Sequence, residues 1–423
     1  MEQLLQYVWH HRIFPLQALQ TVQGDTLEVL DSGLPHTDAG PDFFNAKIKF
    51  NGIVWVGNVE VHLKASDWFR HHHETDAAYD TVILHVVSVS DRVVKRSDGE
   101  EIPQLVLPVP ADVEQNYREL LAASAFPPCY RIVPSLPKLI VHSWMDTLRI
   151  ERLEQKYAQL QVRLGRCEGR WEDATFVTLA RNFGFGLNTD TFELWASQIP
   201  LQAVGRHRDD LFQIEAFFFG QAGLLETEAG DEYYMALRKE YLYLARKFGL
   251  TPMDGSLWRF LRTRPQNFPH VRIAQLAYLY QQAQGLLSRL IEVDSLKDAG
   301  ALLQTGTSAY WRTHYTFESS SLERNNSLSH TAITLLTINT VVPVLFAYGR
   351  HIGREDLCSR AAGFLEQLAP ENNYIIRMWS QVGLQAQHAG DSQALIQLKK
   401  TYCDNRKCLH CRFGYYYLRR KVS

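Results

Sequence analysis

The chain has 423 residues and a formal net charge of −2, with 46% hydrophobic and 21% charged residues. This composition excludes a disordered chain and is typical of a globular protein with two or three domains. A net charge near zero excludes a whole-molecule attraction to nucleic acid or to an anionic membrane, so such binding needs a local basic patch.

The first 125 residues alternate between helical and strand patterns. In chain order we expect a helix over 2–20 that Pro15 ends, strands over 26–30, 43–50 and 53–63, a helix over 68–73 capped by Ser66, a strand over 82–87, and a second hairpin that turns at Ser97-Asp98-Gly99 into 102–109. Asn51-Gly52 is a strong signal for a type I′ hairpin turn. These elements predict a mixed α/β sheet domain over residues 1–125.

The pattern changes at Phe126-Pro127-Pro128, after which strand signals almost disappear. Further helices are expected at about 139–164, 172–183, 190–198, 207–224, 231–247, 271–284, 327–347, 355–368, 373–388 and 391–402. We therefore predict an all-α domain over residues 126–423 and the fold class α+β. The most apolar window, 332–348, is too short to span a membrane and contains Pro343, so we expect a buried helix there and no membrane partner. The N-terminus has no secretory signal pattern, which favours a cytoplasmic protein.

The strand over 53–63 carries the first candidate site. A period of two places Glu60, His62 and Lys64 on one face, and Asp42 precedes the neighbouring strand. This spacing resembles the PD-(D/E)xK nuclease superfamily, whose core is helix, three strands, helix, strand. The resemblance implies a restriction-endonuclease-like sheet, with Asp42 and Glu60 as ligands of Mg²⁺ or Mn²⁺. His62 occupies the position of the family's water-orienting lysine, so either His62 or Lys64 would take that catalytic role.

Strict hairpin register works against this site. It pairs Asp42 with Val61, so that Asp42 and Glu60 face opposite sides of the sheet. A kink at Pro41 or a bulge at Gly57-Asn58 would bring the two carboxylates together. The alternative is an ordinary polar, solvated sheet face.

A run of three histidines suggests a different set of metal ligands for the same site. In a helix His71, His72 and His73 lie on different faces, so at most one or two point at the sheet. His71 or His73, together with His62, Asp67 and His85, would form a nitrogen-rich site better suited to Zn²⁺ or Mn²⁺ than to Mg²⁺. Alternatively, the run is a surface turn and His85 is a hydrogen-bonded core residue.

Three of the six cysteines, Cys403, Cys408 and Cys411, crowd one short segment. Without an export signal this spacing favours metal binding over disulfides, with structural zinc or part of an iron–sulfur site as the candidates. A fourth ligand would come from His410, Cys358 or an upstream histidine. The alternative is three reduced thiols.

Arginines interleaved with aromatic residues form a further candidate, a nucleic-acid contact made by Arg259, Arg262, Arg264 and Arg272. In a helical domain such arginines usually pair with acidic neighbours instead.

The segments GPDFFNAKI, GNVEVHLKASDW, ILHVV, EAFFFGQAGLL, RPQNFPHVRIAQLA and CLHC span most of the chain. Together they resemble an uncharacterised bacterial family of unknown function, common in Bacteroidota. The resemblance implies kinship and a bacterial cytosolic protein, and gives no activity. Two hypotheses follow. The first is a metal-dependent nuclease or phosphodiesterase whose helical domain clamps nucleic acid. The second is a non-catalytic helical scaffold that binds a protein or nucleic-acid partner and carries a degenerate nuclease-like sheet.

Overall fold

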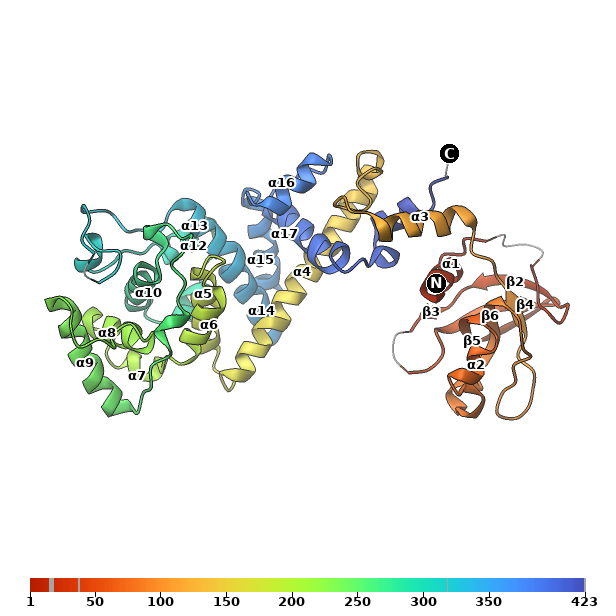
Figure 1. Cartoon of the computed structure of the whole chain (residues 1–423), viewed down its shortest axis with the longest axis horizontal. Helices are drawn as coiled ribbons and strands as arrows, with labels where there is room; N and C mark the ends of the chain where they lie inside the picture. Colours follow the sequence, from red (N-terminus) through yellow and green to blue (C-terminus); the bar gives the residue numbers. More distant parts are fainter. Residues whose placement is uncertain (15–18, 37–38, 318, 422–423) are drawn as a thin grey trace. The chain divides into compact units, whose positions relative to one another are not determined.

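The chain divides into two compact units, each described by itself (Figure 1). The computed structural model describes residues 1–14, 19–36, 39–317 and 319–421. Unit 1 consists of Met1–Trp144, Met378–Leu384 and Leu398–Ser423, and unit 2 of Met145–Arg377 and Gln385–Gln397. The boundary expected between residues 125 and 126 therefore falls inside unit 1, because segments from the helical part of the sequence complete this unit.

Unit 1 is built on a mixed seven-stranded sheet with the strand order β1-β2-β4-β5-β6-β7 and with β3 paired to β4. The strands are β1 (Leu19–Gln20), β2 (Thr26–Asp31), β3 (Leu34–Pro35), β4 (Phe43–Phe50), β5 (Ile53–Lys64), β6 (Val82–Val89) and β7 (Gln104–Val106). Neighbours from β1 to β5 pair antiparallel, whereas β5, β6 and β7 pair parallel. This sheet and the helices of unit 2 give the α+β class that the sequence predicts.

The β4–β5 hairpin turns where the sequence predicts it. Asn51 and Gly52 both have positive φ, at 45° and 90°, and Phe50 pairs with Ile53 directly beside them. A type I′ turn needs this backbone conformation at both central positions, which Asn-Gly adopts at little cost. The hairpin therefore fixes the register from which the candidate site is built.

A bulge in β4 then shifts that register. Ala46 pairs with Gly57 but Phe43 pairs with Val59, so two residues, Phe44 and Asn45, face one residue of β5. Asn45 has a φ of 55°, and its N–H donates to the side-chain oxygen of Asn58 at 3.1 Å. If the pairing of Phe43 with Val59 is extended by one residue, Asp42 lies across from Glu60.

Strict register would place Asp42 and Glu60 on opposite sides of the sheet, and this shift brings them to the same side. The sequence offers a bulge at Gly57-Asn58, whereas the extra residue lies on the opposite strand. Gly57 has another role: a Cβ there would lie 2.3 Å from the Ile83 side chain, so glycine allows β6 to pack closely against β5.

Helix α1 (Glu2–His10) packs against β5. Its buried face carries Leu4, Leu5, Val8 and Trp9, and the Trp9 indole donates to the carbonyl oxygen of Ser32 at 3.0 Å. The helix ends at His10, earlier than predicted, and Pro15 lies outside the described residues.

Two further expectations differ from the structure. The Ser66 side chain does not cap α2 (Asp67–Arg70); its hydroxyl donates to Asp91 at 2.8 Å. The second hairpin is present only at its turn: Ser97-Asp98-Gly99 reverses the chain and Lys95 forms an isolated antiparallel bridge with Glu101, but the strand that follows, β7, pairs parallel with β6. The loop between β6 and β7 is long enough to return the chain to the start of β6, so β7 runs in the same direction.

Unit 1 is completed by helices from distant parts of the chain. These are α3 (Ala111–Ala122), the start of α4 (Lys138–Arg166) and α18 (Arg412–Leu418). The Asn116 side chain in α3 donates to the carbonyl oxygens of Leu418 at 3.1 Å and of Arg420 at 2.9 Å. These bonds hold the segment after residue 398 onto α3.

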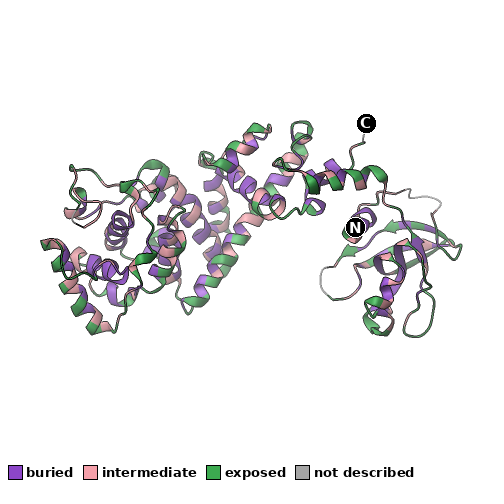
Figure 2. Cartoon of the chain, in the orientation of Figure 1, coloured by how far each residue is buried: buried purple, intermediate pink, exposed green. Residues whose placement is uncertain are grey.

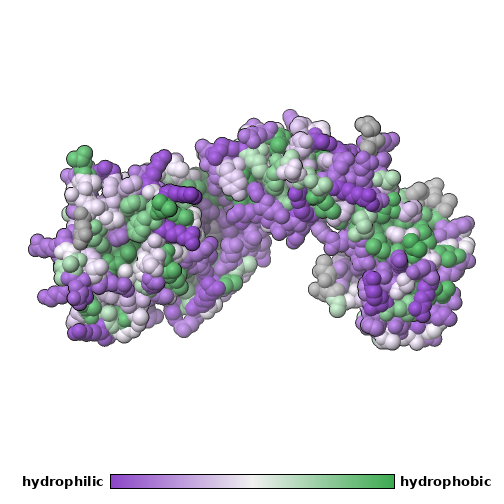
Figure 3. All heavy atoms as spheres, in the orientation of Figure 1, coloured by the Kyte–Doolittle hydropathy of each residue, from purple (hydrophilic) through white to green (hydrophobic). Residues whose placement is uncertain are grey.

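Unit 2 is helical, and among the described residues every strand lies in unit 1. Its helices include the rest of α4, α5 (Trp171–Phe183), α6 (Thr189–Ser197), α7 (Leu201–Gly205), α8 (Leu211–Gln221), α9 (Glu232–Phe248), α10 (Pro269–Ala283), α11 (Leu286–Ile291), α12 (Leu296–Leu303), α13 (His330–Leu336), α14 (Val342–Ile352), α15 (Glu355–Gln367), α16 (Tyr374–Gln381, shared with unit 1) and α17 (Ala389–Gln397). Their buried faces carry a continuous apolar core (Figure 2). Polar side chains cover much of the face drawn in Figure 3.

Among the described residues, one stretch, His330–Ile352, is long and apolar enough to cross a membrane. Leu336, Ile338, Val341, Val344 and Leu345 in this stretch are all fully buried in unit 2. It therefore forms the buried helix that the sequence predicts around residues 332–348.

Candidate metal centre

Asp42, directly before β4, and Glu60, on the neighbouring strand β5, lie next to each other in the sheet. The Asp42 N–H donates to Glu60 Oε2 at 3.1 Å, and Asp42 Oδ2 accepts the Val61 N–H at 3.0 Å. Gln6 of α1 donates to the other Asp42 oxygen at 3.0 Å. The bulge in β4 thus brings together the two acids that strict register would separate.

Both carboxyl groups hold their protons more tightly than usual. Burial, together with the neighbouring Glu60 charge, raises the pKa of Asp42 to about 7. Burial also raises the pKa of Glu60 to about 8, against the opposing effect of the Asp42 N–H. Two buried carboxylates side by side are costly when both are ionised, and a divalent cation between them removes that cost.

Three histidines, His62, His71 and His73, lie beside these carboxyl groups. The distance from Glu60 Oε1 is 3.3 Å to His62 Nε2 and 3.4 Å to His73 Nε2, and His62 Nε2 lies 3.1 Å from His71 Nδ1. Ligand nitrogens of His62, His71 and His73 all lie within 4.8 Å of one another. Around a tetrahedral Zn²⁺ with bonds near 2.0 Å, neighbouring ligand atoms lie about 3.3 Å apart. Three nitrogens therefore lie close enough together for one metal ion to bind them, and a Glu60 oxygen lies beside two of them.

Two of these imidazoles, His62 and His73, are held in the neutral form that binds metal. Burial, reinforced by the neighbouring histidines, lowers the pKa of His62 to about 2, and burial also lowers the pKa of His73. A neutral ring offers the lone pair that a metal ion binds.

His85 lies behind this group. It is fully buried on β6 across from Glu60, and its Nε2 is 2.9 Å from His62 Nδ1. If His62 donates through Nδ1, its Nε2 is left bare toward Glu60 and His71. A ligating histidine usually donates its other ring N–H to a partner in this way. His85 thus orients His62.

The chain between α2 and β6 explains how two of the adjacent histidines converge. Helix α2 ends at Arg70, and His72 has a φ of 62°. This left-handed residue turns the chain so that ring nitrogens of His71 and His73 both lie within 4.8 Å of His62, with His73 buried and both His71 and His72 exposed. The predicted helix over 68–73 would have separated them. Tyr79 stacks on His73 with 3.7 Å between ring centroids.

The remaining predicted residues of the cluster lie apart from these ligand atoms. Asp67 accepts the Lys64 N–H at 3.2 Å and pairs with Arg70 at 3.2 Å, so its contacts hold the turn after β5. The Lys64 side chain is exposed, and its charge acts on Asp91.

The four predicted arginines lie in unit 2. Arg272 is buried, donates to Gln275 and Asn267, and lies over the Phe185 ring at 4.5 Å. These contacts make it a packing residue. The other three, Arg259, Arg262 and Arg264, are exposed.

The three clustered cysteines are all buried in unit 1. Cys129, directly after Phe126-Pro127-Pro128, is buried with them, and sequence reasoning did not consider it as a partner. Of the suggested fourth ligands, His410 is exposed and Cys358 lies in unit 2, where its thiol donates to the Phe346 carbonyl oxygen at 3.5 Å.

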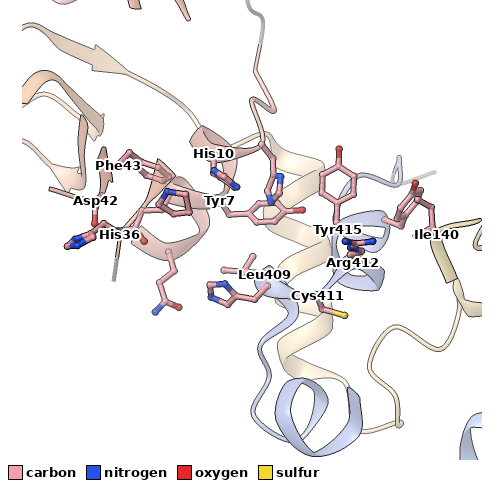
Figure 4. Close-up of a pocket in the computed structure, with 16 residues that line it drawn as sticks. Tyr7, His10, His36, Asp42, Phe43, Ile140, Leu409, Cys411, Arg412 and Tyr415 are labelled. Atoms are coloured by element: carbon pink, nitrogen blue, oxygen red, sulfur yellow. The ribbon is translucent and has the colours of Figure 1, made fainter. Parts of the chain in front are cut away.

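A pocket of about 800 Å³ opens beside Asp42 within unit 1 (Figure 4). Tyr7 and His10 of α1 line it, and so do His36 and Phe43. The wall formed by the segment after residue 408 contributes His410, Arg412, Tyr415 and Tyr416. The pocket thus combines a carboxylate, a guanidinium and several aromatic rings.

Comparison with curated proteins and comparison with solved structures each gave no match. A family model described as "Protein of unknown function (DUF2851)" matches residues 2–374, which include the sheet and all the histidines of the metal centre. The chain belongs to the DUF2851 family.

Proposed function

We propose that this protein is a metal-dependent phosphodiesterase acting on nucleic acid. The observation that carries the proposal is the convergence of His62, His71 and His73, with Glu60 beside two of these rings and Asp42 beside Glu60. The nitrogen-rich donor set favours Zn²⁺ or Mn²⁺ over Mg²⁺. A bound cation at such a site supplies a Lewis acid for the phosphoryl oxygen and lowers the pKa of water.

The order of elements supports the same proposal. Apart from the two-residue strands β1 and β3, the order of helix α1, strands β2, β4 and β5, helix α2 and strand β6 is helix, three strands, helix, strand. Asp42 begins one strand and Glu60 lies on the next, as in the PD-(D/E)xK nucleases. His62 occupies the place of their lysine, and α2 is a single short turn.

Asp42 is the residue suited to move a proton. Its side chain faces the pocket, and two donors, Gln6 and the Val61 N–H, hold its oxygens in place. A carboxylate whose pKa is about 7 accepts a proton from water near neutral pH and releases it again. We therefore assign Asp42 as the general base and Glu60 with the histidines as ligands.

The pocket suits a nucleotide. The exposed Arg412 guanidinium donates to the Ser143 hydroxyl and has further N–H groups that could bind a phosphate, and Tyr415 and Tyr416 offer ring faces on which a base can stack. Tyr7 and Phe43 add apolar surface on the opposite wall.

The test compares metal-free full-length protein with protein loaded with Zn²⁺, Mn²⁺ or Mg²⁺. Substrates are single- and double-stranded DNA and RNA, and a small aryl phosphodiester. We expect Zn²⁺- or Mn²⁺-dependent cleavage that His73→Ala abolishes together with metal binding by the histidines. Asp42→Asn should keep the metal and lose about 10²–10⁴-fold in rate. His72→Ala, beside His73 but exposed, is the matched control. A metal-loaded wild type that cleaves none of these substrates refutes the proposal.

One observation favours the non-catalytic scaffold as a second candidate. Glu60 is only 5% exposed and His62 only 1%, as in a structural network. On this alternative, a partner co-purifies with the protein, and Asp42→Asn leaves partner binding and cell function unchanged.

A further inference from the structure

Four cysteines form a second group of metal-ligand side chains in unit 1. Cys129, Cys403, Cys408 and Cys411 are each 7–8% exposed, and all six cysteines of the chain are free of disulfides. Every pair among the four is close enough for their charges to interact. Two segments of the chain, more than 270 residues apart in sequence, therefore deliver four thiols to one buried place.

The backbone around Cys408 and Cys411 is shaped to hold sulfur. The Cys411 N–H approaches the Cys408 carbonyl oxygen at 3.3 Å, which closes a tight turn between them. The backbone N–H groups of Phe413 and Gly414 donate to the Cys411 sulfur. Burial has the larger effect and raises the pKa of the Cys411 thiol to about 11, so the turn alone does not make this sulfur a thiolate.

Gly414 is required for this geometry. A Cβ at this position would lie 2.0 Å from the Cys408 carbonyl oxygen. The backbone after Cys411 therefore folds back onto Cys408 at a distance that no other residue type permits.

We propose that Cys129, Cys403, Cys408 and Cys411 bind one structural Zn²⁺ as a four-thiolate site. Four cysteines satisfy a closed tetrahedral zinc site, whereas hard cations prefer oxygen ligands. Binding replaces the four thiol protons with one cation and joins Cys129 to the segment after residue 398. The proposal is independent of the histidine centre, which uses other residues.

The site has a consequence for the pocket. Cys411 and its neighbours Leu409, His410 and Arg412 form one of its walls. A cation held by the four thiolates would fix this wall, so zinc removal should alter the pocket without touching Glu60 or the histidines.

The experiment uses the full chain with Co²⁺ as a spectroscopic probe. Four thiolates give an intense sulfur-to-cobalt charge-transfer absorption that nitrogen and oxygen ligands do not give. We expect this band in the wild type and also in His73→Ala, which lacks the histidine centre. The charge-transfer band of Cys129→Ser should be weaker, because one of the four thiolates is missing. This variant should also release Zn²⁺ to a chelator at least tenfold faster than the wild type. Cys167→Ser, which alters a buried cysteine of unit 2, is the matched control and should match the wild type.

Three outcomes would overturn the proposal. They are a wild type without the charge-transfer band, purified protein whose iron content and visible absorption indicate an iron–sulfur cluster, and Cys129→Ser behaving like Cys167→Ser. If Cys129→Ser fails to fold, the wild-type spectrum and zinc content still decide the question. Failure of the nuclease assay leaves these measurements unaffected, so the two proposals stand or fall separately.

Discussion

Replacing Glu60 by glutamine should change how the stability of the metal-free protein depends on pH. In the folded protein Glu60 has a pKa of about 8, whereas the ordinary value is 4.5. Between pH 6 and pH 8 the unfolded chain carries the ionised side chain while the folded protein keeps the proton. Stability therefore falls as pH rises, by close to 1.4 kcal/mol per unit until the folded group itself ionises. The wild type should lose about 2 kcal/mol from this group over the range.

Glu60→Gln keeps an acceptor for the Asp42 N–H and removes the titration. The difference in unfolding free energy between variant and wild type should therefore move by about 2 kcal/mol in favour of the variant from pH 6 to pH 8. Urea unfolding of chelator-treated protein at pH 6, 7 and 8 measures this difference. Glu28→Gln, an exposed carboxylate of the same sheet, is the control. A difference for Glu60→Gln that stays constant with pH refutes the reasoning, because Glu60 would then be ionised in the fold.

Three further results follow from the structure. Asn58→Ala removes the acceptor for the bulge N–H, so it should cost about 1–3 kcal/mol and weaken Zn²⁺ binding in a calorimetric titration. Gly414→Ala places a Cβ against the Cys408 carbonyl and should lower the thermal midpoint and the zinc content, whereas Gly165→Ala, with open space around it, should not. Burial raises the pKa of Glu215 to about 7, so unit 2 should lose about 2 kcal/mol between pH 5 and pH 7, and Glu215→Gln should abolish that loss. Thermal unfolding at the two pH values would contradict this if both proteins lost the same stability.

The elements of the fold were largely predictable because they depend on local periodicity. The Asn51-Gly52 turn, the alternation along β5 and the helices of unit 2 are each encoded within a few neighbouring residues. The period-two pattern also placed Glu60 and His62 on one face.

The remaining parts of the candidate site depend on features without a local signal. The bulge at Asn45 rests on a hydrogen bond to Asn58, on another strand. The convergence of His71 and His73 depends on the early end of α2 and on the left-handed conformation of His72. Cys129 joins Cys403 only through the tertiary fold. Sequence spacing cannot show which distant residues become neighbours, so these contacts needed the structure.

The discontinuity of unit 1 constrains how the protein is made. Residues 1–144 leave the ribosome first, but Leu398 and the residues after it, which bond to Asn116, follow the whole of unit 2. At typical elongation rates that interval is on the order of tens of seconds. The sheet with its histidines can therefore form well before the pocket wall exists. The nascent protein then holds Glu60 and the histidines without that wall of the pocket, and a fragment that stops at residue 144 would lack the wall permanently.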